Sequence, residues 1–226
     1  MLSETRENIK EFYDFITEYP LLGLHHKAGV QLEKEIRELP LYSVENEIWY
    51  RAKAPDSTRI FTQKDMMPPL PEDTREGRYN HYGLPCLYAS ENEETCASEI
   101  RREGESGVLC WIQKIKINGA KVIDLTAPQK LNDPDCFLLE GLLLTQTIVI
   151  HPSEKRKYYK PEYKITRFIA DLCRLYKIDG IKYPSAVSKK SGASQDQDGI
   201  SSCNIVLFDT KGKLFTFEGE PYVFKE

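Results

Sequence analysis

The sequence predicts an α+β fold, in which helices and strands are mixed without a regular βαβ repeat. Three observations support this class. Apolar residues recur at helical spacing in several segments, short runs rich in β-branched and aromatic residues lie among and after them, and an Asn-Gly dipeptide separates two of those runs. At 226 residues, the chain is long enough for one well-buried core with an appendage.

The first 45 residues are expected to form an N-terminal helical extension. Two apolar stripes at helical spacing lie in it, each followed by a proline: Ile9, Phe12, Tyr13 and Ile16 before Pro20, and Val30, Leu32, Ile36 and Leu39 before Pro40. Residues 46–226 are then expected to form the main domain. The run IWYRAK at 48–53 predicts its first strand, and the proline-rich, charged stretch 55–77 predicts an ordered surface loop or a lid.

The short predicted strand CLYAS is followed by a predicted helix over residues 91–103. Ser90 and Glu93 have the spacing of a capping box, which indicates where this helix begins. Glu99 projects about 60° from the apolar Cys96 on a helical wheel. Its carboxylate therefore lies at the border of the buried stripe, where it is able to face a cleft.

The second half of the chain alternates between the two kinds of element. Strands are expected at 107–117 and 120–125, joined by a hairpin turn at Asn118-Gly119. Helices are expected at 134–148 and 160–177, and late strands at 179–183, 203–208, 213–217 and 221–224. The polar segment between Tyr183 and Cys203 is too long for a simple connection, so it is expected to be disordered or to form part of a site.

The composition and the apolar segments exclude several kinds of partner. Lys+Arg 31 against Asp+Glu 35 gives a net charge of −4, which is unfavourable for gripping a polyanion, so no nucleic-acid partner is expected. The charged start of the chain lacks the apolar region of a secretory signal, which favours the cytoplasm. The apolar stretch 137–150 contains Glu140 and Gln146 and is shorter than the ~20 residues of a membrane span, so no membrane partner is expected either.

No metal site or bound cofactor is expected. The six cysteines are scattered without a CxxC pair and are predicted to be reduced core thiols. No cysteine–histidine cluster has zinc spacing, and Asp196 and Asp198 lack the distal glutamate of a calcium loop. No GxGxxG motif follows a strand, so a Rossmann dehydrogenase is not supported.

Five motifs follow one another in a fixed order: WYRA at Trp49–Ala52, GRYN at Gly77–Asn80, LYAS then TCASEIR around Glu99, DGIKYPS ending at Ser185, and NIVLF beginning at Asn204. Together they resemble the RES domain family, named for an arginine, a glutamate and a serine. The resemblance covers roughly residues 46 to 210 and is specific because five separated motifs match. It makes residues 46–226 a RES-like catalytic domain.

The resemblance implies a fold related to ADP-ribosyltransferase toxins, with mixed and antiparallel sheets flanked by helices, and a chemistry that consumes NAD⁺. It assigns catalytic roles to three residues: Glu99, Arg51 and Ser185. It assigns substrate contacts to five more: Arg78, Tyr79, Asn80, Tyr88 and Asn204. NAD⁺ is then the substrate rather than a cofactor. The segment after Ser185 is longer than in compact members of the family, so Ser188 and Ser191 remain alternatives for the serine.

The residue types fit this substrate independently of the family. Guanidinium groups bind phosphate oxygens through a planar fork, so Arg51 and Arg78 are candidates to hold the pyrophosphate. Tyrosine rings such as that of Tyr88 are able to stack on nicotinamide. Cleavage of the bond between ribose and nicotinamide develops positive charge on the sugar, and a carboxylate such as Glu99 stabilises that charge. No histidine stands in a motif with Ser185, so a hydrolase triad is not supported.

The preferred function is NAD⁺ degradation, by a glycohydrolase or phosphorylase that acts as the toxin of a bacterial toxin–antitoxin pair. One alternative is a mono-ADP-ribosyltransferase that modifies a protein or nucleotide. Another is a catalytically spent scaffold whose N-terminal helices bind a partner, although every polar motif residue is present. NAD⁺ and a cognate antitoxin are the expected partners, the latter from the resemblance only, and self-association remains open.

Overall fold

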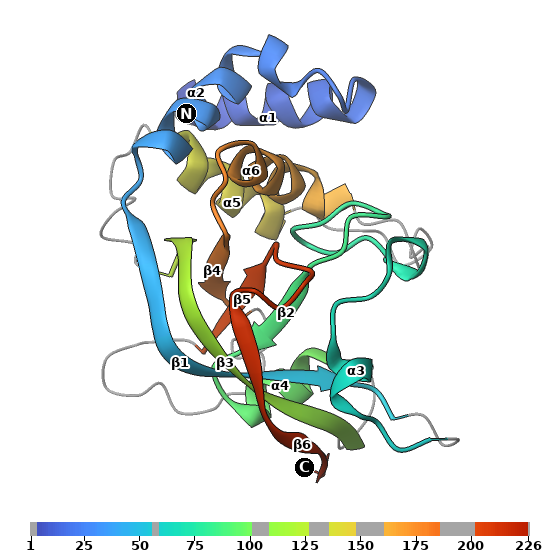
Figure 1. The fold of residues 1–226 in the computed structure, drawn as a ribbon. Coiled ribbons are helices and arrows are strands. Elements are labelled where there is room, and N and C mark those ends of the chain that lie inside the picture. The colour runs from blue at the N-terminus through green and yellow to red at the C-terminus, as the bar shows by residue number, and fades with distance from the viewer. Residues whose placement is uncertain are drawn as a thin grey trace. The chain divides into compact units, whose positions relative to one another are not determined.

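The computed structural model describes residues 4–55, 59–100, 109–126, 136–147, 161–185 and 202–225. Helices and strands are mixed as predicted, so the α+β class is confirmed (Figure 1). The chain divides into two compact units. Unit 1 comprises Met1–Pro40, Leu70–Pro85 and Ala127–Ile178, and unit 2 comprises Leu41–Pro69, Cys86–Thr126 and Asp179–Glu226.

Unit 1 is helical in its described part. Its elements are α1 (Glu4–Glu18), η1 (Gly23–His25), α2 (Lys27–Glu38), η2 (Pro71–Asp73), α5 (Phe137–Thr147), η5 (Pro161–Tyr163) and α6 (Lys164–Leu175). The four α-helices pack on one another through their apolar faces. The fully buried side chains at this core are Ile9, Phe12, Leu32, Ile36, Leu138 and Ile165.

A carboxylate joins the N-terminal helices to the rest of unit 1. Glu35 on α2 accepts hydrogen bonds from the N–H groups of Phe137 at 3.1 Å and Leu138 at 2.8 Å, the first residues of α5. A carboxylate at a helix N-terminus satisfies free N–H groups and is favoured by the helix dipole. The predicted division into residues 1–45 and 46–226 stays a prediction, although the helical segment ends earlier than expected because a strand already begins at Leu41.

Unit 2 is built on a six-stranded sheet. Its strands are β1 (Leu41–Lys53), β2 (Leu87–Ser90), β3 (Leu109–Asp124), β4 (Gly180–Pro184), β5 (Cys203–Leu207) and β6 (Phe215–Lys225), with the helices α3 (Gln63–Met66) and α4 (Glu93–Ile100). The strand order is β1-β2-β5-β4-β3-β6, and β1 also pairs with β3, so five of the strands form a closed ring. Every pairing is antiparallel except β3 with β4.

The interior of this ring is the apolar core of unit 2. Twelve buried residues form it, among them Trp49 on β1, Leu87 on β2, Ile115 on β3 and Ile205 on β5. Alternate residues of each strand face inward and fill the ring with apolar side chains. Polar side chains of the predicted site are found near the ends of β2, β4 and β5. The ring is closed between β1 and β2 by a single residue pair.

The predicted hairpin turn at Asn118-Gly119 is wrong. β3 runs through this dipeptide as one strand, and β1 pairs with both halves of it. The pairing shifts register beside the dipeptide, and Gly119 has a φ of 73°. A long partner strand keeps both halves extended, so the left-handed conformation that Asn-Gly favours forms a β-bulge instead of a turn. In the same way, the segments predicted at 213–217 and 221–224 are one strand, β6.

The predicted capping box at Ser90 and Glu93 is also wrong. α4 begins at Glu93, and the N–H of Thr95 donates to Asn92 Oδ1 at 2.8 Å, so Asn92 is the cap. Ser90 is the last residue of β2 and still pairs with β5 through its backbone. Its hydroxyl does not cap α4 and is able to bond another partner.

The other predicted elements are present, with shorter bounds for the helices. α5 and α6 correspond to the helices expected at 134–148 and 160–177, and the stretch expected as a loop or lid contains α3 and η2. The polar segment after Ser185, with Ser188 and Ser191, lies outside the described residues, as does the end of the helix predicted over 91–103.

Candidate active site

Glu99 lies in the last turn of α4 and is held by two neighbours. Its Oε1 accepts a hydrogen bond from Ser185 Oγ at 2.7 Å and another from Asn204 Nδ2 at 2.6 Å. The side chain remains exposed, whereas Ser185 and Asn204 are buried. One carboxylate oxygen is therefore fixed by the protein, and among the described residues no group donates to the other.

The sheet of unit 2 explains why these donors meet. β4 and β5 are antiparallel neighbours in which Tyr183 pairs with Asn204. Ser185 follows β4 directly, and its backbone N–H donates to the Ser202 carbonyl at 2.8 Å. Two motifs that are separated along the chain are thus brought to one end of adjacent strands, opposite the helix that carries Glu99.

Arg51 lies on β1 and is almost fully buried, with 8% of its surface exposed. Its Nη1 donates to the Tyr88 carbonyl at 3.2 Å, and its Nε is buried without a hydrogen bond among the described residues. Burial lowers the pKa of this guanidinium. A buried cation with an unused donor is an unfavourable arrangement unless an anion supplies the missing partner.

Arg51 and Glu99 do not neutralise each other. Both side chains are described, and no ion pair forms between them. The thiols of Cys86 and Cys96 lie near Arg51, and burial raises the pKa of the Cys96 thiol to about 12, so this thiol is neutral and does not balance the cation. Unit 2 therefore contains a guanidinium and a carboxylate that do not pair with each other among the described residues. Tyr88 contacts Arg51 through its backbone carbonyl, and its side chain is half-buried.

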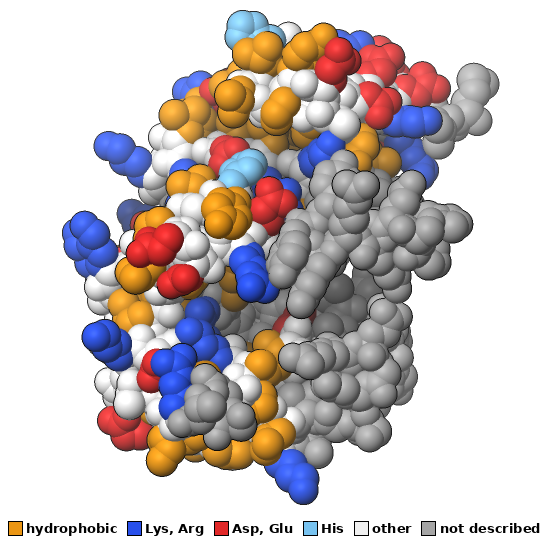
Figure 2. Space-filling view, turned by 90° about the vertical axis from the view of Figure 1, so that its right-hand side faces the viewer, with side chains coloured by type: hydrophobic (Ala, Val, Ile, Leu, Met, Phe, Trp, Pro, Cys, Tyr) orange, Lys and Arg blue, Asp and Glu red, His pale blue; other side chains and the backbone are white. Residues whose placement is uncertain are grey.

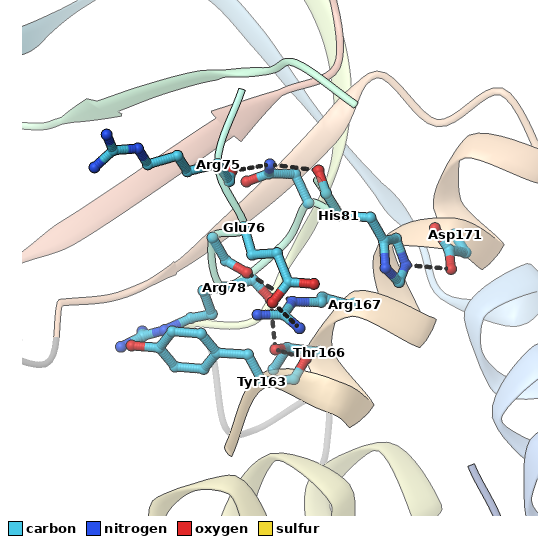
Figure 3. Close-up of polar contacts among 10 residues, drawn as sticks. Arg75, Glu76, Arg78, His81, Tyr163, Thr166, Arg167 and Asp171 are labelled. Carbon is cyan, nitrogen blue, oxygen red and sulfur yellow. Dashed lines mark hydrogen bonds and ion pairs between the residues drawn. The ribbon is translucent and has the colours of Figure 1, made fainter. Parts of the chain in front are cut away.

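The GRYN motif lies in unit 1, where it forms a tight loop. The N–H of Gly77 donates to the Asn80 carbonyl at 3.1 Å. The guanidinium of Arg78 lies over the Tyr163 ring at 5.5 Å, a cation–π contact, and the Arg78 carbonyl accepts from Thr166 Oγ1 at 2.6 Å (Figure 3). The planar guanidinium is thus held against an aromatic face.

The other two polar residues of GRYN are buried. Tyr79 is 2% exposed, and burial raises the pKa of its phenol. The Asn80 Nδ2 donates to the carbonyls of Arg75 at 2.9 Å and His81 at 3.0 Å. These contacts hold the loop in shape. The predicted substrate contacts of Tyr79 and Asn80 remain predictions.

A second buried arginine, which the sequence motifs did not single out, supports the same loop. Arg167 on α6 pairs with Glu76 at 3.0 Å through Nη1 and donates from Nε to the Gly77 carbonyl at 3.0 Å (Figure 3). A pocket of about 260 Å³ in unit 1 is lined in part by both residues. His81, also at this pocket, pairs with Asp171 at 2.8 Å.

Ser90 is another polar residue near Glu99 that the sequence motifs did not single out as a candidate site residue. Its Oγ donates to Asn204 Oδ1 at 2.7 Å, and both residues are 4% exposed. Its place at the end of LYAS made it look like a helix cap, and only the pairing of β2 with β5 brings it to Asn204.

The remaining sequence expectations concern metals, thiols, membranes and charge. The six cysteines, all of which are described, form no disulfide, and five of them are buried, as expected for core thiols. The described residues contain no group of three or more ligands suited to a metal ion, and none of the described helices has the length and apolar character to span a membrane. On the face shown in Figure 2, the described Lys and Arg side chains are interspersed with acidic ones.

The structure places five of the predicted residues in unit 2, in two groups. Glu99 contacts Ser185 and Asn204, and Arg51 contacts the Tyr88 carbonyl. Arg78, Tyr79 and Asn80 form a second set in unit 1. The meeting of the two sets around one substrate stays a prediction.

Comparisons with known proteins address the family and the fold of the chain. No curated protein matches the chain. Among solved structures, the chain is similar to one in the crystal structure of the M. tuberculosis MbcT-MbcA toxin-antitoxin complex, with a TM-score of 0.53 and 14% identity over 86% of this chain and 92% of that one. At this identity the likeness shows the fold alone. The RES domain model matches residues 48–221, most of the chain, and the protein therefore belongs to the RES domain family.

Proposed function

We propose that this protein degrades NAD⁺ by cleaving the bond between nicotinamide and ribose, and that it is the toxin of a toxin–antitoxin pair. The observation that carries the proposal is the Glu99 carboxylate, which Ser185 and Asn204 fix through one oxygen while the other oxygen is left without a described donor. Such a carboxylate is preorganised to stabilise positive charge in a ligand.

The reaction needs little else from the protein. The glycosidic bond between ribose C1 and the nicotinamide nitrogen breaks, and its electron pair goes to nicotinamide, which leaves as a neutral molecule. Positive charge develops on the ribose, where Glu99 stabilises it electrostatically. Water or phosphate then forms the new C1–O bond, and the proton of an attacking water passes to solvent. Since the leaving group already carries its positive charge, no second carboxylate is required to protonate it.

Arg51 supplies the second part of the proposed site. Its guanidinium is buried beside the Tyr88 carbonyl and has an unused Nε donor. The pyrophosphate of NAD⁺ carries the negative charge and the acceptor oxygens that such a group lacks. Arg78 in the GRYN loop is the proposed second phosphate contact, and Tyr88 a proposed ring contact with the substrate. In this scheme Ser185 and Asn204 orient Glu99 rather than attack the substrate.

The toxin role rests on family membership and on the fold. The RES domain match covers most of the chain, and the M. tuberculosis structure with a similar fold is a toxin–antitoxin complex. A partner that occupies the Glu99 region would silence the proposed activity. We therefore propose a cognate antitoxin as the protein partner.

The direct test is to incubate the pure protein with NAD⁺ and to follow free nicotinamide. Parallel reactions in water and in phosphate buffer identify the acceptor, because one yields ADP-ribose and the other its phosphorylated form. A third reaction with cell lysate detects ADP-ribose attached to protein or nucleotide, the outcome that would establish a transferase instead. Nicotinamide release without such attachment supports the proposal, whereas no release under any of the three conditions rejects it.

A growth assay tests the toxin role. Induced expression of the wild-type chain should arrest the host and deplete its NAD⁺, and expression of Glu99→Gln at the same level should do neither. Normal growth with depleted NAD⁺ would support the proposed NAD⁺-degrading activity and reject the proposed toxin role.

A further inference from the structure

We propose that Ser90 is a positioning residue, which fixes the amide of Asn204 and through it the carboxylate of Glu99. This inference rests on the proposed function, since it assigns Ser90 a part in the same reaction. Ser90 does not touch the carboxylate in the described structure. It acts through one intermediate side chain.

A continuous line of hydrogen bonds carries the inference. Ser90 Oγ donates to Asn204 Oδ1 at 2.7 Å, and Asn204 Nδ2 donates to Glu99 Oε1 at 2.6 Å. Ser90 and Asn204 are each 4% exposed, so water does not readily replace either partner. The line ends on the exposed carboxylate that the proposed reaction uses.

The Glu99 carboxylate determines the donor-to-acceptor direction of these hydrogen bonds. An ionised carboxylate only accepts hydrogen bonds, so Asn204 must present its NH₂ group to Glu99. The amide oxygen then points the other way and needs a donor, which the Ser90 hydroxyl supplies. Without that hydroxyl, the buried amide oxygen loses its partner, and the amide is no longer held in the orientation that donates to Glu99.

The sheet places Ser90 at this point by backbone pairing. Ser90 pairs with Asn204 on β5 on one side and with Tyr50 on β1 on the other. It is therefore held between two strands, and its neighbour on β1 immediately precedes Arg51. A side chain anchored in this way has little freedom to follow a moving partner, which suits a group that must fix another.

The helix that carries Glu99 is anchored through Cys96, whose thiol also interacts with the Ser90 side chain. Cys96, three residues before Glu99 on α4, donates from its thiol to the Tyr50 carbonyl at 3.0 Å. Burial raises the pKa of this thiol to about 12, so the thiol keeps its proton. When the Ser90 hydroxyl is lost, the Tyr50 carbonyl still holds the helix. The comparison with Asn204→Ala separates the path through Asn204 from the contact of Ser90 with Cys96.

The test begins with Ser90→Ala in the full-length protein, measured by nicotinamide release from NAD⁺. We expect kcat to fall about ten-fold, the effect of one lost hydrogen bond, with KM changed less than two-fold because Ser90 makes no substrate contact. Ser90→Thr, which returns the hydroxyl, should recover most of kcat. The control is Ser43→Ala, which removes a strand hydroxyl that donates to the exposed Glu45 at 2.9 Å.

A double-mutant comparison separates positioning from a general structural role. If Ser90 acts through Asn204, adding Ser90→Ala to Asn204→Ala should lower kcat no further, because the intermediate is already missing. If the two effects on kcat multiply, the proposed path is wrong. Thermal unfolding of all variants, with activity expressed per folded molecule, removes any loss that comes from reduced stability.

The outcomes distinguish this inference from the function on which it rests. Wild-type protein that releases no nicotinamide rejects the proposed function and the inference with it. Wild-type activity with an unchanged kcat in Ser90→Ala rejects only the inference. A fall in kcat that Ser90→Thr does not recover, in a variant that folds normally, also rejects it.

Discussion

Two buried arginines, one in each unit, have nearly the same exposure but different partners. Arg167 in unit 1 is 6% exposed, pairs with Glu76 and donates to the Gly77 carbonyl. Arg51 in unit 2 is 8% exposed, and among the described residues its hydrogen-bond partner is the Tyr88 carbonyl. Each leaves one nitrogen buried without a hydrogen bond, Nη2 in Arg167 and Nε in Arg51.

The partners of a buried arginine indicate whether its charge stabilises the fold or is a candidate to bind a ligand. A buried guanidinium that is paired with a carboxylate holds segments together, and removal of one partner leaves the other uncompensated. A buried guanidinium without a carboxylate carries a desolvation cost that no partner offsets, which makes it a candidate to bind an anionic ligand. By this criterion we expect Arg167 to support the fold of the GRYN loop and Arg51 to act in the proposed site. The following variants test that division.

The largest expected effect is on turnover, from Glu99→Gln. The substitution keeps the size of the side chain and removes the charge, so kcat should fall about 10²- to 10⁴-fold while the melting temperature stays within a few degrees of wild type. Nicotinamide release and thermal unfolding measure the two quantities. Glu94→Gln, on the exposed face of the same helix, is the matched control. Turnover within a factor of three of wild type would remove Glu99 from the catalytic role.

The next largest effect is on stability, from Arg167→Met. This variant leaves the Glu76 carboxylate and the Gly77 carbonyl without their partner, and we expect the free energy of unfolding to fall by about 3 kcal/mol. Chemical denaturation measures the free energy of unfolding, and Lys34→Met on the exposed face of α2 is the control. kcat per folded molecule should be retained. An unchanged stability would contradict the structural role.

Arg51→Met is the counterpart in the other unit. An apolar side chain of similar length removes a desolvated charge, so stability should stay the same or increase, whereas KM for NAD⁺ should rise about 10- to 100-fold. Steady-state kinetics and denaturation of the same preparation give both values. A loss of stability as large as that of Arg167→Met, with KM unchanged, would erase the distinction between the two arginines.

The smallest expected effect comes from Asn80→Ala. The amide of Asn80 holds the GRYN loop by donating to the carbonyls of Arg75 and His81, so its loss should cost about 1 to 3 kcal/mol of unfolding free energy. Denaturation measures the cost, and kinetics at a temperature where the variant is folded measures KM. A large rise in KM without a loss of stability would instead favour a direct substrate contact.

Local sequence pattern predicted most elements of the fold. Apolar periodicity identified the N-terminal helices and α5 and α6, and the short apolar runs identified the strands. It failed at Asn118-Gly119, where a dipeptide that favours a turn was kept extended by the long partner strand β1. It failed again at Ser90, where the spacing to Glu93 suggested a helix cap but the hydroxyl bonds to Asn204.

The motifs in the sequence were enough to predict which residues carry the chemistry. Their order predicted Arg51, Glu99, Ser185 and Asn204, because the proposed reaction requires these residue types whatever brings them together. Which polar groups have partners could be learned only from the fold. Hydrogen bonding and charge pairing depend on neighbours that are distant along the chain, so the fixed oxygen of Glu99, the single carbonyl partner described for Arg51 and the contact of Ser90 with Asn204 follow from the way strands and helix pack.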